Sequence, residues 1–328
     1  MTSPFAEAVE QIDYPDSDAA HRLRLAIDAS AVPSGALGRL GELAAWAAGV
    51  QGSCPPSGFE RATLVVVAAE HGIARSGVSA YPLEHTARLA HLITAGDAPV
   101  QRITGAPRVR LVDTARWPVR SPSGPIDRED ALSLEETRLL LEHGMAVADE
   151  LVDSGCDLVL ADTIGVGSGT PAAVLISVLT DTEPVRVVGR GTGIDDATWI
   201  RKAAAVRDAR RRAWRYRGSA EHLLATAGGA DTATLTGLIV QAARRRTPVL
   251  LGGLPSLAAA LVAQLAVPRI ARWLAVGQAV SDPGHELALR RLGLVPLQDL
   301  AVTMDGGVGP ALALATLRAA TTLVVATE

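Results

Sequence analysis

The sequence is poor in cysteine, which occurs only at Cys54 and Cys156 among 328 residues. Neither cysteine has the spacing of a zinc ligand, and two cysteines cannot form the dense cross-links of a small secreted protein. A structural zinc site and a disulfide framework are therefore excluded. Because such scarcity is typical of a reducing compartment, we expect a cytoplasmic location.

An excess of charge of either sign is also absent. The chain has 31 Lys and Arg against 35 Asp and Glu, which gives a formal net charge of −4. This balance offers no electrostatic reason to expect a nucleic-acid partner. The two arginine runs, at residues 210–212 and 244–246, end helix-like segments, where solvated basic residues complement the helix dipole.

Long uninterrupted apolar runs are missing as well. Residues 248–268 carry no charge, but Gly252, Gly253 and Pro255 divide them into a short strand, a turn and a core helix. The first 18 residues contain acidic side chains and no long apolar core, unlike a secretory signal. We therefore expect neither a membrane span nor a cleaved leader.

Short apolar runs that alternate with helical patterns indicate the fold class. The runs lie at residues 63–67, 109–112, 158–160, 185–188 and 248–251. Such alternation predicts an α/β protein with a three-layer, Rossmann-like α/β/α arrangement around a parallel sheet. We expect the nucleotide-binding core to span residues 60–300, and residues 1–59 plus 301–328 to form a smaller helical lobe.

The run that follows the third of these strands is rich in glycine. Gly165, Gly167 and Gly169 lie between an apolar strand and a predicted helix. Glycine lets the backbone approach a ligand closely, and the N–H groups of a new helix point toward a bound anion. Other strands are also followed by polar and glycine residues, so we expect a single cleft at the carboxyl ends of the strands.

Several motifs together resemble one known family over nearly the whole chain. In order, they are Pro33-Ser34-Gly35-Ala36-Leu37-Gly38-Arg39-Leu40, Glu70-His71-Gly72, the segment 77–82, Gly165-Val166-Gly167, the turn 189–193 followed by Lys202, Pro283-Gly284-His285, and Leu292-Gly293-Leu294. Their order and spacing resemble nicotinate-nucleotide:dimethylbenzimidazole phosphoribosyltransferase. This family moves the 5-phosphoribosyl group from nicotinate mononucleotide to dimethylbenzimidazole in cobamide lower-ligand assembly.

The resemblance implies roles for particular residues, and it implies neither a metal nor another cofactor. The donor phosphate would be bound by Gly165, Gly167, Ser168, Gly191, Gly193 and Lys202. The aromatic acceptor would contact Ser79, Tyr81, Arg88, Leu89 and Met304. Because members of the family are dimers, the resemblance also implies a homodimer or a heterodimer with a homologue.

The chain departs from the family where the family's general base is expected. The family has Leu-Gly-Glu-Gly-Thr-Gly near its C-terminus, and this chain has Gly306 at the position of the glutamate. Asp305, one residue earlier, is the candidate substitute base. The family's Glu-Met, Gln-Met, Asp-Gly-Phe and Ser-His pairs or triplets are also replaced, by Thr163-Ile164, Arg88-Leu89, Gly252-Gly253-Leu254 and Gly277-Gln278.

These departures leave three hypotheses. The chain is a working phosphoribosyltransferase for dimethylbenzimidazole or a related acceptor, such as a phenolic or purine-like base. Alternatively, it is a catalytically impaired homologue that binds nucleotides, because binding groups are better preserved than the base. In the third hypothesis it is an inactive partner subunit of an active paralogue.

Overall fold

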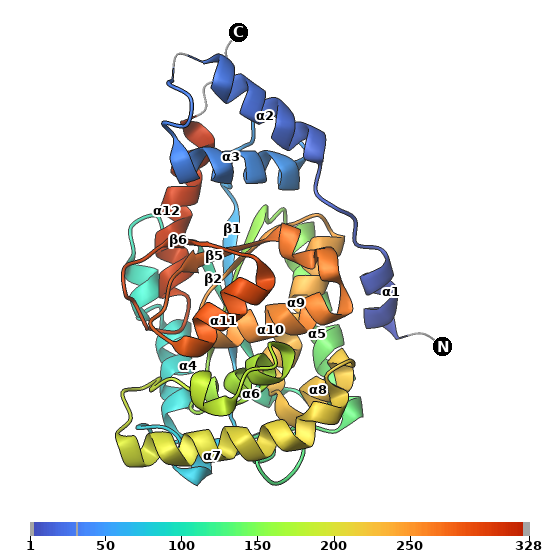
Figure 1. Cartoon of the computed structure of the whole chain (residues 1–328), viewed down its shortest axis with the longest axis vertical. Helices are drawn as coiled ribbons and strands as arrows, with labels where there is room; N and C mark the ends of the chain where they lie inside the picture. Colours follow the sequence, from blue (N-terminus) through green and yellow to red (C-terminus); the bar gives the residue numbers. More distant parts are fainter. Residues whose placement is uncertain (1–2, 31, 324–328) are drawn as a thin grey trace.

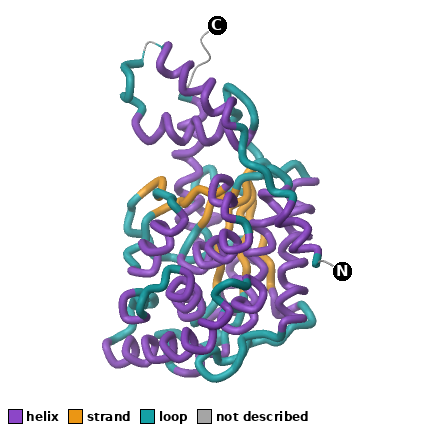
Figure 2. Tube along the Cα trace, turned by 45° about the vertical axis from the view of Figure 1, so that its right-hand side comes forward, coloured by secondary structure: helices purple, strands orange, loops and turns teal. Residues whose placement is uncertain are grey.

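The protein is known here from a computed structural model that describes residues 3–30 and 32–323. Its centre is a sheet of six parallel strands in the order β2-β1-β3-β4-β5-β6, drawn in orange in Figure 2. The strands are β1 (Ala62–Ala68), β2 (Arg108–Asp113), β3 (Leu158–Ile164), β4 (Val249–Leu251), β5 (Leu274–Gln278) and β6 (Pro296–Gln298). The predicted α/β/α class is confirmed.

Four of the five predicted strands are confirmed, and the one at residues 185–188 is wrong. That segment begins with a short 3₁₀ helix, η4 (Pro184–Arg186), and Val185 is 63% exposed. A central strand of a parallel sheet is buried on both faces, which this exposure rules out. The two strands at the far edge, β5 and β6, are additional to the prediction.

The order of the strands reverses between β1 and β3. The chain moves from β1 outward to β2 and then crosses back to β3, so Val65 pairs with Arg110 on one side and Ala161 on the other. In open parallel sheets such a reversal opens a crevice at the carboxyl ends of the strands. The crevice between β1 and β3 is thus the expected ligand site.

Helices cover both faces of the sheet. One layer contains α5, α9 and α10, and the other contains α4 and α12, as the right and left sides of Figure 1 show. The helices are α1 (Pro4–Glu10), α2 (Ser17–Ala29), α3 (Gly38–Gln51), α4 (His85–Ala95), α5 (Leu134–Asp153), α6 (Gly169–Leu179), α7 (Asp196–Ala213), α8 (Ala220–Ala227), α9 (Ala230–Arg244), α10 (Leu254–Ala266), α11 (Pro283–Leu292) and α12 (Val308–Thr322).

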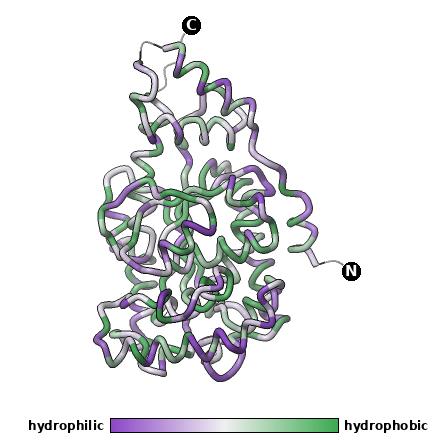
Figure 3. Tube along the Cα trace, viewed as in Figure 1, coloured by the Kyte–Doolittle hydropathy of each residue, from purple (hydrophilic) through white to green (hydrophobic). Residues whose placement is uncertain are grey.

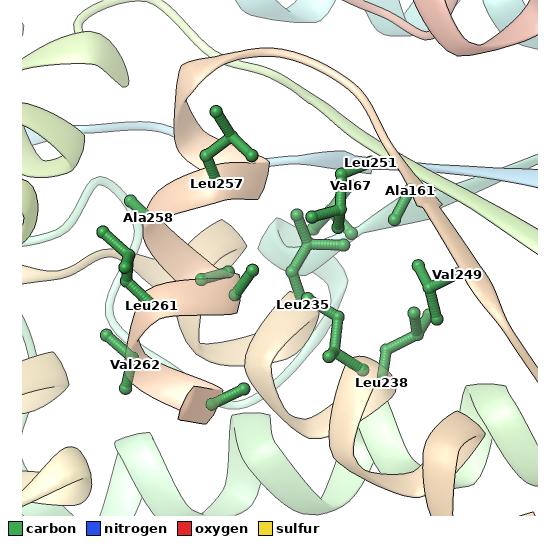
Figure 4. Close-up of a cluster of buried hydrophobic side chains, with 14 of the residues drawn as sticks. Val67, Ala161, Leu235, Leu238, Val249, Leu251, Leu257, Ala258, Leu261 and Val262 are labelled. Carbon is green, nitrogen blue, oxygen red and sulfur yellow. The ribbon is translucent and has the colours of Figure 1, made fainter. Parts of the chain in front are cut away.

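The core covers both faces of the sheet, and a large part of it lies between the sheet and the layer that contains α9 and α10. In Figure 4, Leu235 and Leu238 of α9 point toward strand residues such as Val249, and all three are buried. Helices α5 and α9 approach closely because a glycine of each helix faces the backbone of the other helix. A Cβ on Gly144 would lie 1.9 Å from the carbonyl oxygen of Thr234. Glycine is therefore required at this crossing.

Hydrophilic residues are concentrated in the outer segments, and the centre of the molecule is mainly hydrophobic (Figure 3). Helices α2 and α3 pack together at one end, and α3 also packs on α12 (Figure 1). Helix α1 instead packs against α9 and α5, so the N-terminal segment contributes to the core as well as to this end. The division at residues 59 and 301 stays a prediction, and residues 1, 2, 31 and 324–328 of the predicted lobe lie outside the described residues.

Candidate active site

A cavity of about 690 Å³ opens at the carboxyl ends of the strands. Its walls come from the segments that follow β1, β3, β4, β5 and β6, together with α4 and Lys202 of α7. The cavity thus lies beside the reversal between β1 and β3, as the topology requires. The turn 189–193 also reaches it, although no strand precedes that turn.

The glycine-rich turn after β3 forms one wall of this cavity. A Cβ on Gly165 would lie 2.5 Å from the carbonyl oxygen of Ala69, and Gly167 has φ +87°, so both positions favour glycine. Helix α6 begins at Gly169, and its first turn faces the cavity. The buried Thr86 on α4 accepts a hydrogen bond from the amide of Val166 at 3.0 Å, which fixes the turn against α4.

Lys202 is the only lysine in the chain, and it is buried at this wall. Its Nζ donates a hydrogen bond to the carbonyl oxygen of Gly189 at 3.0 Å. The same Nζ lies 3.6 and 3.5 Å from the points that a Cβ on Gly169 or Gly191 would occupy. The structure therefore brings together a cation, a helix N-terminus and the turn 189–193, which is the composition of a phosphate site.

Asp282 provides a negative charge that acts on this cation. It caps α11 by accepting a hydrogen bond from the amide of Gly284 at 2.9 Å. Burial lowers the pKa of Lys202, and the charge of Asp282 opposes that change. Burial likewise raises the pKa of Asp282, and Lys202 opposes the rise. The two groups stabilise each other's charge at the edge of the cavity.

A second carboxylate, Asp162, lies at the floor of the cavity near the end of β3. It accepts hydrogen bonds from the amides of Gly253 at 3.1 Å and Gly307 at 2.7 Å, and from Ser256 Oγ at 3.4 Å. Burial raises the pKa of Asp162 and these donors oppose the rise. No role was predicted for this residue, although a charged side chain inside a strand of apolar neighbours is a readable signal of a site.

Asp305 faces the cavity from the loop before α12. Its Oδ1 lies 2.9 Å from the point that a Cβ on Gly253 would occupy, and Asp162 Oδ1 lies 3.6 Å from the same point. The residue as a whole is exposed, but neighbouring groups desolvate its carboxyl group and raise its pKa to about 8, with further contributions from the charges of Asp162, Asp231 and Asp282. A carboxyl group that titrates near neutral pH is suited to proton transfer.

The backbone at position 306 is unfavourable for the glutamate that serves as the base in the family. Gly306 is buried with φ +83°, and a Cβ there would lie 3.3 Å from Ile164 Cγ2. Its amide donates a hydrogen bond to the carbonyl oxygen of Thr163 at 3.1 Å. A side chain at this position would be strained, whereas Asp305 already points to the cavity.

Four of the five predicted acceptor residues line the cavity. These are Ser79, Tyr81, Leu89 and Met304, and the Tyr81 ring stacks on His85 with 4.5 Å between centroids. Thr192 accepts a hydrogen bond from the amide of Ala80 at 3.0 Å, which connects the segment 77–82 to the turn 189–193. Arg88 is exposed and is not among the lining residues, so its predicted role in binding the acceptor stays a prediction.

His71 is placed behind the glycine turn. Its Nε2 lies 3.1 Å from Oδ2 of the buried Asp231, and a Cβ on Gly165 would lie 3.3 Å from its ring. This buried pair packs against the turn at Gly165 and does not line the cavity. Within residues 3–30 and 32–323 no group of three or more His, Cys, Asp or Glu side chains could hold a metal ion.

The chain is similar to known proteins over most of its length. A family model described as phosphoribosyltransferase matches residues 12–327. The chain is 47% identical over 323 residues to nicotinate-nucleotide–dimethylbenzimidazole phosphoribosyltransferase of Mycobacterium ulcerans, covering 94% of this chain and 90% of the relative. It is 48% identical over 322 residues to the enzyme of the same name from Mycobacterium avium, covering 94% and 92%.

Among solved structures, the chain is similar to CobT from Thermus thermophilus. The TM-score is 0.88 at 31% identity, over 94% of this chain and 96% of that one. The family model, together with this fold, defines a phosphoribosyltransferase. More particularly, the chain belongs to the nicotinate-nucleotide–dimethylbenzimidazole phosphoribosyltransferase family. No helix among its described residues is long and apolar enough to cross a membrane.

Proposed function

We propose that this protein transfers the 5-phosphoribosyl group of nicotinate mononucleotide to dimethylbenzimidazole or a related aromatic base, and releases nicotinate. The observation that carries the proposal is that one cavity collects three kinds of group. Lys202 and the start of α6, apolar side chains such as Leu89, and the carboxylate of Asp305 all line it. Donor phosphate and acceptor ring thus each have complementary groups in the same cavity.

In the proposed reaction, the bond between C1′ of the ribose and the nicotinate nitrogen breaks, and its electron pair leaves with nicotinate. The lone pair of the acceptor nitrogen forms the new bond to C1′. The acceptor's N–H proton passes to the Asp305 carboxylate. The negative charge of the Asp305 and Asp162 carboxylates also favours the positive charge that develops on the ribose ring.

The residues around Lys202 position the donor for this transfer. Lys202 and the amides of the first turn of α6 would bind the phosphate, and Ser168, Gly191 and Gly193 complete the same wall. Fixing the phosphate places C1′ at a set distance from it. Positioning of this kind is a major part of catalysis in a two-substrate reaction.

The absence of a glutamate at Gly306 favours a second candidate, a protein that binds the donor without turnover. The phosphate wall is independent of the loop that carries Asp305, so binding survives if catalysis does not. In that case the chain would act as a nucleotide-binding protein or as the partner subunit of an active homologue. We also propose a dimer, homotypic or with such a homologue, and a cytoplasmic location, which the two free cysteines support.

The experiment is chromatographic measurement of nicotinate release from nicotinate mononucleotide, with and without dimethylbenzimidazole, beside calorimetric binding of the donor. Acceptor-dependent release is the expected result. Binding without release would replace the transferase by the nucleotide-binding candidate, and no binding would contradict both. Co-purification of a homologous chain would identify the partner-subunit form.

A further inference from the structure

Asp162 connects three segments that are far apart in the sequence. Its side chain, at 1% exposure, is held near the end of β3. Oδ1 accepts the amide hydrogen bond of Gly253, which follows β4, and Oδ2 accepts that of Gly307, which precedes α12. The position of Gly307 itself requires glycine, because its φ is +91° and a Cβ would lie 2.2 Å from Leu64 Cδ2.

The bond to Gly307 fixes the segment that carries Asp305. Gly306, between the two, is anchored to the Thr163 carbonyl on the same strand. Asp305 is therefore followed by two residues whose backbones are attached to the end of β3. Its carboxylate then lies close to that of Asp162, since both are within 4 Å of the point that a Cβ on Gly253 would occupy.

The Asp162 carboxylate fills space that a side chain at position 252 would need. A Cβ on Gly252 would lie 2.5 Å from Asp162 Cγ and less than 3 Å from both of its oxygens. A side chain at position 252 and the Asp162 carboxylate would therefore occupy the same space, so only one of the two positions can have a side chain there. A carboxylate at the floor of the cavity could come from β3 or from the residue that follows β4.

We propose that Asp162 is a positioning residue whose buried carboxylate anchors the loop of Asp305 and holds the two carboxylates as one proton-accepting pair. This inference rests on the proposed transferase function for its catalytic meaning. Two carboxylates that both approach one point repel each other when both are charged, so the pair binds a first proton more readily than an isolated carboxylate does. Asp162 keeps the charged form more readily, since N–H donors surround it, so Asp305 is the member of the pair that takes up and releases the proton.

Other charged groups near the pair also affect the pKa of Asp305. Asp231 on α9, which contacts His71, and Asp282 before α11 both raise the pKa of Asp305. Lys202 from α7 lines the same cavity and contacts the Gly189 carbonyl. Removal of the Asp162 charge should therefore lower the pKa of Asp305, while its desolvation and the other two aspartates remain.

The first test observes the carboxyl groups directly and does not depend on activity. Protein labelled with ¹³C at the Asp carboxyl carbons is titrated by NMR, and the Asp305 signal is identified by its loss in Asp305→Asn. We expect its midpoint to fall by roughly one to three pH units in Asp162→Asn. Asp149→Asn, which removes a carboxylate on α5 that binds Gln241 and Arg245, is the control and should leave the midpoint unchanged. An unchanged midpoint in Asp162→Asn overturns the proposal.

The second test exploits the shared space at position 252. Gly252→Asp alone should reduce nicotinate release at least tenfold, because its side chain collides with Asp162, and Asp162→Ala alone should do the same by freeing the loop. The double variant Asp162→Ala/Gly252→Asp should regain much of the loss. If it is no better than Asp162→Ala, a carboxylate at this point does not hold the loop. Should Asp162→Ala fail to fold, Gly252→Ala, whose methyl collides with the Asp162 carboxylate, tests the same displacement, and nicotinate release at the wild-type rate would contradict the proposal.

The readouts separate this inference from the proposed function. Donor affinity depends on the phosphate wall, so calorimetric binding should remain within a few fold in all the folded Asp162 variants while kcat falls. If wild-type protein releases no nicotinate, the transferase proposal fails, and the NMR titration still decides whether the pair exists. A loss of donor binding equal to the loss of kcat would show that Asp162 supports the whole cavity and would contradict a positioning role for Asp305.

Discussion

Replacement of Lys202 by methionine removes the ammonium group from the phosphate wall while keeping a side chain of similar length. The wild-type Nζ reaches Gly189 and lies close to Gly169 and Gly191, so a donor phosphate bound there would accept a charged hydrogen bond from it. The variant should bind nicotinate mononucleotide more weakly. Binding of nicotinate riboside, which has no phosphate, should not change.

The magnitude follows from the type of interaction that is lost. A hydrogen bond that involves a charged group contributes about 1.5–3 kcal/mol, which corresponds to a roughly 10- to 150-fold increase in Kd. The upper part of this range applies if the phosphate is largely removed from water. Folding should be retained, because the cost of burying the Lys202 charge, seen in its lowered pKa, disappears with it.

The assay is isothermal calorimetry with both ligands on the wild type, Lys202→Met and a control, Arg211→Met. Arg211 is exposed on the same helix, α7, so the control removes a positive charge away from the cavity. Circular dichroism and Tm verify the fold. Equal affinity of Lys202→Met and wild type for the mononucleotide would refute the placement of the phosphate, as would an equal loss for the riboside.

Three further outcomes are expected. Nicotinate release should increase with pH through about 8, because only the deprotonated form of Asp305 can accept the acceptor's proton, and a rate independent of pH between 6 and 9 would exclude Asp305 as the base. Gly306→Glu should lower Tm without raising turnover more than a few fold, since φ is +83° and Ile164 lies close; a large gain with dimethylbenzimidazole would mean that the loop adapts to the glutamate. Gly167→Ala should destabilise the fold by about 1–3 kcal/mol in chemical denaturation because of its positive φ, whereas Gly218→Ala, with open space around it, should change stability by less than about 0.5 kcal/mol.

The fold was predictable from the sequence where strands are long and apolar. The runs that became β1 and β3 are buried throughout, as central parallel strands are, and their short length and β-branched residues favour strands over helices. The segment 185–188 has the same composition but follows Pro184, which starts a 3₁₀ helix, and one of its valines faces solvent. Composition alone does not reveal which apolar run finds a neighbouring strand.

The edge strands were missed because tertiary contacts, more than propensity, define them. Strand β6 has only three residues, and all are half-buried, so its local sequence differs little from that of a loop. The five residues of β5 follow directly on a 3₁₀ helix that includes Trp273. A short apolar run in such a setting cannot be assigned to a strand by periodicity.

The candidate site was predictable in its glycines and only partly in its charges. Positive φ and close backbone approach explain why Gly165 and Gly167 stand out in the sequence. The role of Lys202 was predicted from the resemblance to the family. An independent signal is that it is the only lysine in a chain that has 30 arginines. Asp162 could not be assigned, because its partners Gly253 and Gly307 are 91 and 145 positions away and meet it only in the folded sheet.

The separation of Asp162 from Gly307 also determines when the site is completed during synthesis. The glycine turn, the turn 189–193 and Lys202 all lie within residues 165–202, so the phosphate wall is encoded in the middle of the chain. The loop of Asp305 emerges more than 100 residues later, and α12 must then pack against α3 near the opposite end of the sequence. A growing chain therefore contains every residue of the phosphate wall before it contains the proposed base, and the ability to transfer the ribosyl group is among the last properties that translation supplies.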